Sequence, residues 1–233
     1  MPDVAFHIPL TLAEVEAWPG LRCRGMAGPR VRARLGDILA QVQGEGLIAP
    51  VGGYEIWPVA RVRPGRLMLE NGVVFKAPLL SHSLRRASAL AAVTASIGAR
   101  LGEQVSAWFS AGKCLRAVLL DEIGNFALGR LAAQLYEAVE AEGRRRGLEV
   151  SSPLHPGNDD GFGLDAQPEV LALSGGDALG ISLSRTGMMV PEKSRSAVLG
   201  LGRHMPRWSR AQGCARCKSR ERCAHRLMRE EAS

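Results

Sequence analysis

Three cysteines near the C-terminus have the spacing of a metal-binding motif. Cys214 and Cys217 form a C-x2-C pair, and Cys223 follows after five intervening residues. A C-x2-C turn directs two thiolates at one ion, and thiolate is the soft ligand that suits iron–sulfur clusters and zinc. The arginines and lysine between these cysteines would favour the thiolate form and offset the charge of a cluster. The triad therefore predicts a metal centre.

The metal and its fourth ligand are less closely specified. Cys114 is the strongest candidate for the fourth ligand, because it begins an expected long helix whose dipole favours a thiolate. Cys23, His204 and His225 are alternatives. Zinc sites usually combine two C-x2-C pairs, or one such pair with two histidines, and neither pattern is present. Three clustered cysteines and a distant one are more typical of iron–sulfur proteins. The expected ligands of a [4Fe–4S] cluster are Cys214, Cys217, Cys223 and Cys114, with zinc as the alternative.

Composition and charge favour a globular protein without membrane spans or a disulfide framework. The chain has 233 residues, of which 46% are hydrophobic, so it can bury a sizeable core. No apolar run reaches the roughly 18 residues needed to cross a bilayer, and no secretory signal is apparent, so we expect a cytoplasmic protein. An odd number of cysteines, five, argues against a disulfide framework. The net charge of +7 fits either an anionic partner or a solvated surface. Nucleic acid is not the expected partner, because Trp208 is the only aromatic residue in the basic tail and base stacking needs several.

The apolar pattern predicts an α+β fold, with helices packed on a twisted, mostly antiparallel sheet. Helical spacing indicates helices over residues 29–44, 98–110, 113–146 and 165–173, and a short one after Thr11 that stops at Pro19-Gly20. Strands are expected at 6–10, 54–60, 66–70, 73–75, 90–94, 148–150, 180–183, 188–191 and 196–202, with Asn71-Gly72 as a hairpin turn. We expect one domain over residues 1–202 and a cysteine-rich metal-binding tail over 203–233.

Three segments together resemble one family. They are LGEQVSAWF (101–109) with LLDEIG (119–124), then HPG (155–157) leading to LDAQ (164–167), then SRTGMMVPEKS (184–194). Their order resembles the activation (reactivation) domain of cobalamin (vitamin B12)-dependent methionine synthase, in a free-standing form with an added cysteine motif. The resemblance implies an α+β fold that binds S-adenosylmethionine, docks on a cobalamin domain and supports reductive remethylation of cob(II)alamin.

The candidate ligand loop departs from the family pattern. The family has an Arg shortly before Pro-Gly and a Tyr directly after it, where this chain has Pro153 and Asn158. An Arg pairs bidentately with a carboxylate, and neither replacement can do so. The loop therefore argues against S-adenosylmethionine binding, unless Arg185, Arg195 or Arg203 supplies the guanidinium. The cofactor-binding candidates are His155, Pro156, Gly157, Asn158, Met188 and Met189.

Two hypotheses of function follow. In the first, the chain is a redox activator of a corrinoid-dependent methyltransferase: it binds the corrinoid protein and relays an electron, received from a separate donor, through its iron–sulfur cluster. In the second, it is a non-redox module that binds a corrinoid protein or a nucleotide, and a structural zinc pins the tail. The two differ in whether loss of Cys217 removes electron transfer or only stability.

Overall fold

The computed structural model describes residues 6–23, 25, 26, 28–157, 161–208, 212, 215 and 221. The helices are α1 (Leu12–Glu16), α2 (Pro19–Cys23), α3 (Pro29–Gly44), α4 (Pro78–Ser83), α5 (Arg100–Ser110), α6 (Cys114–Arg145), α7 (Gln167–Leu173) and the 3-10 turns η1 (Leu164–Ala166) and η2 (Gly176–Leu179). The strands are β1 (Val51–Arg63), β2 (Arg66–Leu69), β3 (Val74–Phe75), β4 (Ala87–Ser96), β5 (Glu149–Val150), β6 (Ser182–Leu183), β7 (Met189–Val190) and β8 (Ser194–Gly202).

Six strands form one antiparallel sheet in the order β3-β2-β1-β4-β8-β5. The central strand β4 is buried on both faces, and its alanines let helices pack closely against it. Strand β8 pairs with β4 along its whole length, for example Ala91 with Leu199, whereas β5 pairs only with its last two residues. The first half of β8 is therefore an open edge beyond β4.

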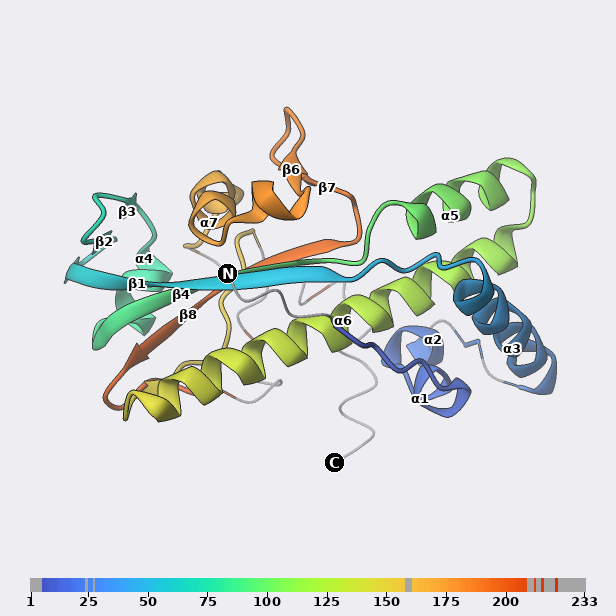
Figure 1. The fold of residues 1–233 in the computed structure, drawn as a ribbon, viewed down its shortest axis with the longest axis horizontal. Helices are drawn as coiled ribbons and strands as arrows, with labels where there is room; N and C mark the ends of the chain where they lie inside the picture. Colours follow the sequence, from blue (N-terminus) through green and yellow to red (C-terminus); the bar gives the residue numbers. More distant parts are fainter. Residues whose placement is uncertain are drawn as a thin grey trace.

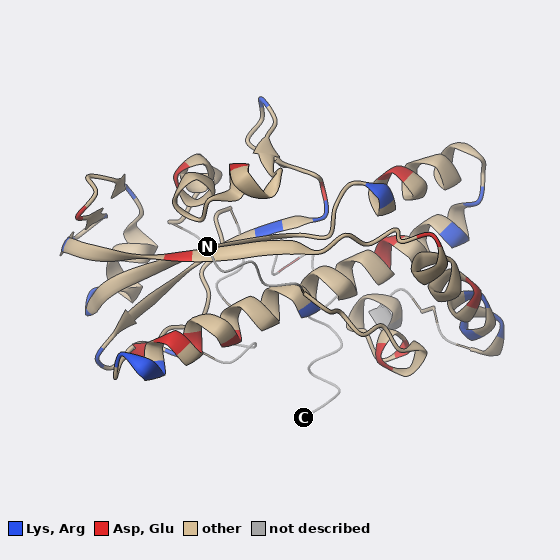
Figure 2. Cartoon of the chain, in the orientation of Figure 1, with Lys and Arg blue, Asp and Glu red and all other residues tan. Residues whose placement is uncertain are grey.

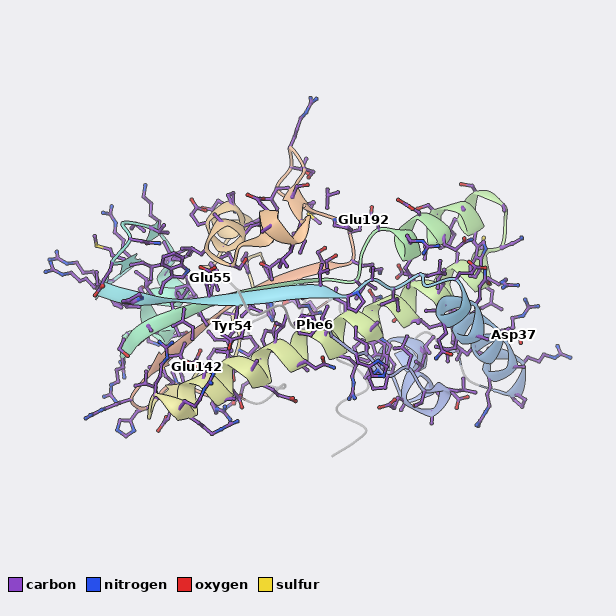
Figure 3. All side chains as sticks on the ribbon, in the orientation of Figure 1. Phe6, Asp37, Tyr54, Glu55, Glu142 and Glu192 are labelled. Carbon is purple, nitrogen blue, oxygen red and sulfur yellow. The ribbon has the colours of Figure 1, made fainter. Side chains whose placement is uncertain are left out.

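Helices cover both faces of the sheet (Figure 1). Helix α6 runs along one face with α1, α2 and α3 beside it, and a core forms there against alternate residues of β4 and β8. The second core, on the opposite face, lies beneath α4 and α7 and includes Leu90 and Val198. Figure 3 shows the same alternation at β1, where Tyr54 and Glu55 lie on opposite sides of the strand. The expected α+β fold, with a mostly antiparallel sheet, is confirmed.

Two expectations near the N-terminus are wrong. Residues 6–10 form no strand, although Phe6, Ile8 and Leu10 pack on the α6-side core. Their alternation reflects burial rather than strand pairing. Pro19 begins α2 instead of only ending α1, which suits a proline because the first helical position needs no N–H partner. Thr11 caps α1 as expected, and its hydroxyl accepts a hydrogen bond from the Glu14 amide at 3.3 Å.

The first part of the predicted tail packs on the domain. Met205 is buried, and Trp208 packs against the second core. Arg207 donates to the Val150 carbonyl at 3.2 Å and to the Glu140 carboxylate at 2.6 Å. Residues 203–208 thus continue the domain, and the cysteines that follow lie outside the described residues.

No helix among the described residues is long and apolar enough to cross a membrane.

Candidate functional site

A cavity of about 590 Å³ lies along the open edge of β8. One wall is the start of β8 itself, and the others come from the loop after β5, from η1 and α7, and from the β6–β7 hairpin. The lining residues are His155, Pro156, Gly157, Leu164, Gln167, Gly187, Met188, Met189, Glu192, Lys193, Ser194, Arg195 and Ser196. Five of the six candidate cofactor-binding residues are among them, and the sixth, Asn158, lies outside the described residues. Glu192 lies in the connection between β7 and β8 (Figure 3).

Backbone contacts fasten the candidate loop to β8. Leu154 exchanges two hydrogen bonds with Val198, both of 2.9 Å, and so extends the β5 edge by one bridge. Two residues earlier on β8, the Ser196 carbonyl lies 2.9 Å from Nδ1 of His155. Gly157 has a φ of +80°, which favours glycine, and its amide donates to the Phe162 carbonyl at 2.8 Å. These contacts therefore hold the loop beside the first half of β8.

His155 is a neutral hydrogen-bonding group. Burial and the nearby Arg195 cation lower its pKa to about 4, although its bond to Ser196 acts in the opposite direction. A carbonyl only accepts, so Nδ1 of the neutral ring carries the proton and Nε2 remains an acceptor. Its ring lies 6.3 Å from that of Tyr136 on α6, centroid to centroid. Burial raises the pKa of Tyr136 to about 12, against the opposing effect of Arg195, which also hydrogen-bonds it.

Two further side chains supply fixed donors. Gln167 lines the cavity, is only 4% exposed, and accepts a hydrogen bond from the Ser196 hydroxyl at 3.1 Å, so its NH2 group is not used in that bond. Arg195 is exposed at the rim. Of the three arginines that the sequence offers as substitutes for the missing guanidinium, Arg195 is the one that lines the cavity.

Helix α6 positions the start of β8 through Lys193. Its ammonium lies 2.7 Å from the Asp121 carboxylate and donates to the Asn125 side-chain oxygen at 2.7 Å. Asp121 is thus a structural partner of this edge. Its neighbour Glu122 faces the other way: it is 2% exposed and accepts a hydrogen bond from the Trp18 indole at 3.0 Å.

The methionine pair lies on the β6–β7 hairpin (Figure 1), and both residues line the cavity. Met188 is 59% exposed, and Val190 two residues later is also exposed. The Ser184 hydroxyl accepts from the Met188 amide at 3.1 Å and so fixes the hairpin turn. Met188 is a surface residue rather than part of either core.

Of the four predicted metal ligands, the structure describes only Cys114. Cys214, Cys217 and Cys223 lie outside the described residues, as does the side chain of Cys23, whereas Cys114 is exposed at the start of α6. Within the described part of the chain, no group of three or more metal-ligating side chains comes together. Cys114 as the fourth ligand therefore stays a prediction.

Sequence reasoning missed Tyr136 and gave Gln167 only as part of a resembling segment. Tyr136 follows Leu135 on an apolar helix stripe, so its period indicates only partial burial. What brings it to the site is the position of the β8 edge, and that position depends on long-range pairing.

Comparison with known proteins shows a similarity at the level of the fold. No family model matches the chain, and no curated protein matches its sequence. Among solved structures, the chain is similar to the MetH reactivation domain in a crystal structure of that domain bound to AdoHcy. The TM-score is 0.61 at 15% identity, over 85% of this chain and 78% of that chain. At this identity the likeness shows a shared fold, and it confirms the fold expected from the three resembling segments.

Proposed function

We propose that this chain is an accessory protein for the reductive reactivation of a cobalamin-dependent methyltransferase. One observation carries the proposal. Segments far apart in sequence that resemble the methionine synthase activation domain, at 155–157, 164–167 and 184–194, all contribute to one cavity. The fold likeness to the MetH reactivation domain supports the same reading.

The surface beside this cavity is suited to a protein that carries a corrinoid. Met188 and Val190 expose apolar side chains on the hairpin, and Leu164 exposes another on the opposite wall. Methionine is flexible and polarisable, so it adapts to an irregular flat surface such as a corrin face. The partner would therefore cover the mouth of the cavity and bury these three side chains.

The cysteine triad is proposed as the metal centre, with a [4Fe–4S] cluster as its occupant. When bound, such a cluster supplies a one-electron carrier. The triad begins six residues after Trp208, which Ser152 holds through hydrogen bonds of 3.1 and 3.4 Å. His204 is proposed as the fourth ligand, with Cys114 as the alternative, because His204 lies only four residues before Trp208 in the sequence and is exposed.

Anaerobic expression with iron, followed by absorption and paramagnetic resonance spectroscopy of the whole chain, tests this part. We expect a brown protein with a reducible cluster, and we expect Cys217→Ser to lose the signal while Cys114→Ser retains it. A colourless protein that contains stoichiometric zinc would instead support the non-redox module with a structural metal.

A second candidate activity is the binding of an adenosyl amino acid in the β8-edge cavity. The specific observation is Arg195, a guanidinium at the rim that can receive a carboxylate in place of the family's missing arginine. The Gln167 amide and neutral His155 add a donor and an acceptor. The structurally similar MetH domain was crystallised with AdoHcy.

Titration calorimetry with S-adenosylmethionine and AdoHcy tests this activity. A built site predicts a micromolar dissociation constant that Arg195→Gln raises by about 30-fold or more, the loss of roughly 2 kcal/mol for a charge-assisted bond. Arg185→Gln is the matched control, because Arg185 belongs to the same hairpin–strand region but does not line the cavity. Millimolar binding by the unaltered chain would show that the loop has lost this function.

A further inference from the structure

A second, basic cavity lies between α3 and the first turn of α6. Its volume is about 460 Å³, and it is lined by Arg30, Ala33, Arg34, Asp37, Ile38 and Arg116. Figure 2 marks Lys and Arg positions in blue on α3 and near the start of α6, and Figure 3 places Asp37 on α3. The cavity shares no lining residue with the one at the β8 edge.

The helical period brings these side chains together. Arg30, Arg34 and Asp37 recur at spacings of four and three residues, so they lie on one face of α3. That face looks toward Arg116, the third residue of α6. Helix α6 has no side-chain cap at its N-terminus, so its dipole adds positive potential to the same region.

Arg116 is held in place before any ligand arrives. Its Nη2 donates to the Gln41 side-chain oxygen at 3.0 Å, and its guanidinium carbon lies 4.6 Å from the centroid of the Trp108 ring. Trp108 is itself buried, which fixes the stacking surface. Within the described residues, the buried Nε of Arg116 has no hydrogen-bond partner. Because Nε is covered and one Nη2 N–H is bonded to Gln41, the remaining N–H groups on Nη1 and Nη2 are the donors left for a ligand.

Positive charge outweighs negative charge among the residues that line this cavity. None of the ion pairs found among the described residues involves Arg30, Arg34 or Arg116. Arg30 and Arg34 are like charges at i,i+4, an arrangement that destabilises an isolated helix. Asp37 is the single carboxylate that lines the cavity. Three guanidinium groups against one carboxylate leave room for a doubly charged anion.

We propose that this cavity binds a phosphate-type oxyanion, as the phosphate group of a small phosphorylated molecule. Guanidinium forks match phosphate oxygens bidentately, and Arg116 presents a pre-oriented one. The small side chain of Ala33 keeps the floor between the arginines open. A cavity of this volume falls in the range that holds a small ligand rather than a bare ion.

Titration calorimetry of the whole chain at low salt, with pyrophosphate as the probe, tests the proposal. We expect a dissociation constant below about 1 mM, and we expect Arg34→Gln to raise it about tenfold. Arg116→Gln should do the same, with circular dichroism to confirm that the fold survives. Arg32→Gln is the matched control: Arg32 lies on the same helix but pairs with Glu16 at 3.5 Å and does not line the cavity.

Parallel titrations with inorganic phosphate, ADP and adenosine identify the source of the phosphate. Tighter binding of ADP than of pyrophosphate would indicate a nucleotide, and equal binding would indicate the phosphate group alone. The proposal is overturned if pyrophosphate does not bind, or if Arg34→Gln and Arg32→Gln weaken binding equally, because that result means diffuse charge attraction. Arg34 is exposed, so its replacement tests the site even if Arg116→Gln unfolds.

Discussion

His155 links the candidate site to the stability of the fold. Burial lowers the pKa of His155 to about 4 in the native state, whereas its pKa in the unfolded state is near 6.5. As the pH falls, the unfolded state is therefore protonated first. Between those values the unfolded state binds more protons, so this contribution to stability is present above pH 6.5 and is lost as the pH falls toward 4.

Urea unfolding at pH 7 and pH 4.5 measures this effect. Between pH 7 and pH 4.5, we expect the free energy of unfolding to fall by about 1–2 kcal/mol more in the unaltered chain than in His155→Asn. This figure allows for solvent screening at a half-buried ring. Asparagine keeps a donor for the Ser196 carbonyl but does not titrate. His82→Asn, at an exposed position, should behave as the unaltered chain does. An identical pH response in His155→Asn would show that His155 is not desolvated.

Individual residues of the site were predictable only where a local motif marked them. His155-Pro156-Gly157 and Met188-Met189 stood out as loop and hairpin sequences, and the structure brings both to one cavity. Tyr136 and Lys193 did not, because their roles depend on which element lies opposite them. A sequence period reports which face of a helix is buried, but it does not report the partner.

At the scale of elements, long periodic segments were predicted well and short ones poorly. Helix α3 has the predicted bounds, and α6 differs by one residue at each end. The six-residue α4 was missed, because it is too short for a helical period to show. Residues 6–10 alternate like a strand yet only pack on a core, so alternation alone did not establish pairing.

The packing of α5 on α6 depends on a glycine. A Cβ at Gly124 would lie 2.7 Å from Cδ2 of the fully buried Leu101 and 3.4 Å from Cε of Lys193. At Gly102 on α5, by contrast, a Cβ would meet nothing within 4 Å. Both positions are helical, so alanine gains the same propensity of about 1 kcal/mol at each.

We therefore expect opposite outcomes for two chemically identical substitutions. Gly102→Ala should stabilise the chain by about 0.5–1 kcal/mol. Gly124→Ala should destabilise it by about 1–2 kcal/mol, because overpacking outweighs the propensity gain. Chemical denaturation of both variants measures the difference. Equal stabilisation by both would mean that Leu101 moves aside freely and that the α5–α6 contact is loose.

At the scale of the whole molecule, functions are spread along α6. Its middle supports the β8-edge cavity through Tyr136 and Asp121, its N-terminus borders the basic cavity, and Glu140 near its C-terminus contacts Arg207 just before the cysteine-bearing tail. The sequence groups Cys114 with the triad, and this stays a prediction, because the triad lies outside the described residues.

Substitution of the candidate ligands tests which residue completes the proposed metal centre. If His204 completes the site, His204→Ala should lower the metal content of the anaerobically purified chain, whereas Cys114→Ser should leave it unchanged. Iron and zinc analysis of both variants, beside Cys217→Ser, measures this. Loss of metal from Cys114→Ser, with none from His204→Ala, would show that Cys114 supplies the fourth ligand instead.

The proposed reactivation role requires that the chain pass an electron to a corrinoid. The reduced, anaerobically reconstituted protein is mixed with cob(II)alamin in the presence of iodomethane, and methylcobalamin is followed by absorption. One electron converts Co(II) to Co(I), which then displaces iodide and retains the methyl group. We predict one methylcobalamin for each electron stored in the protein, and none with Cys217→Ser. Equal yields from the two proteins, or no yield from the unaltered chain, would contradict a reactivation role through the cysteine triad.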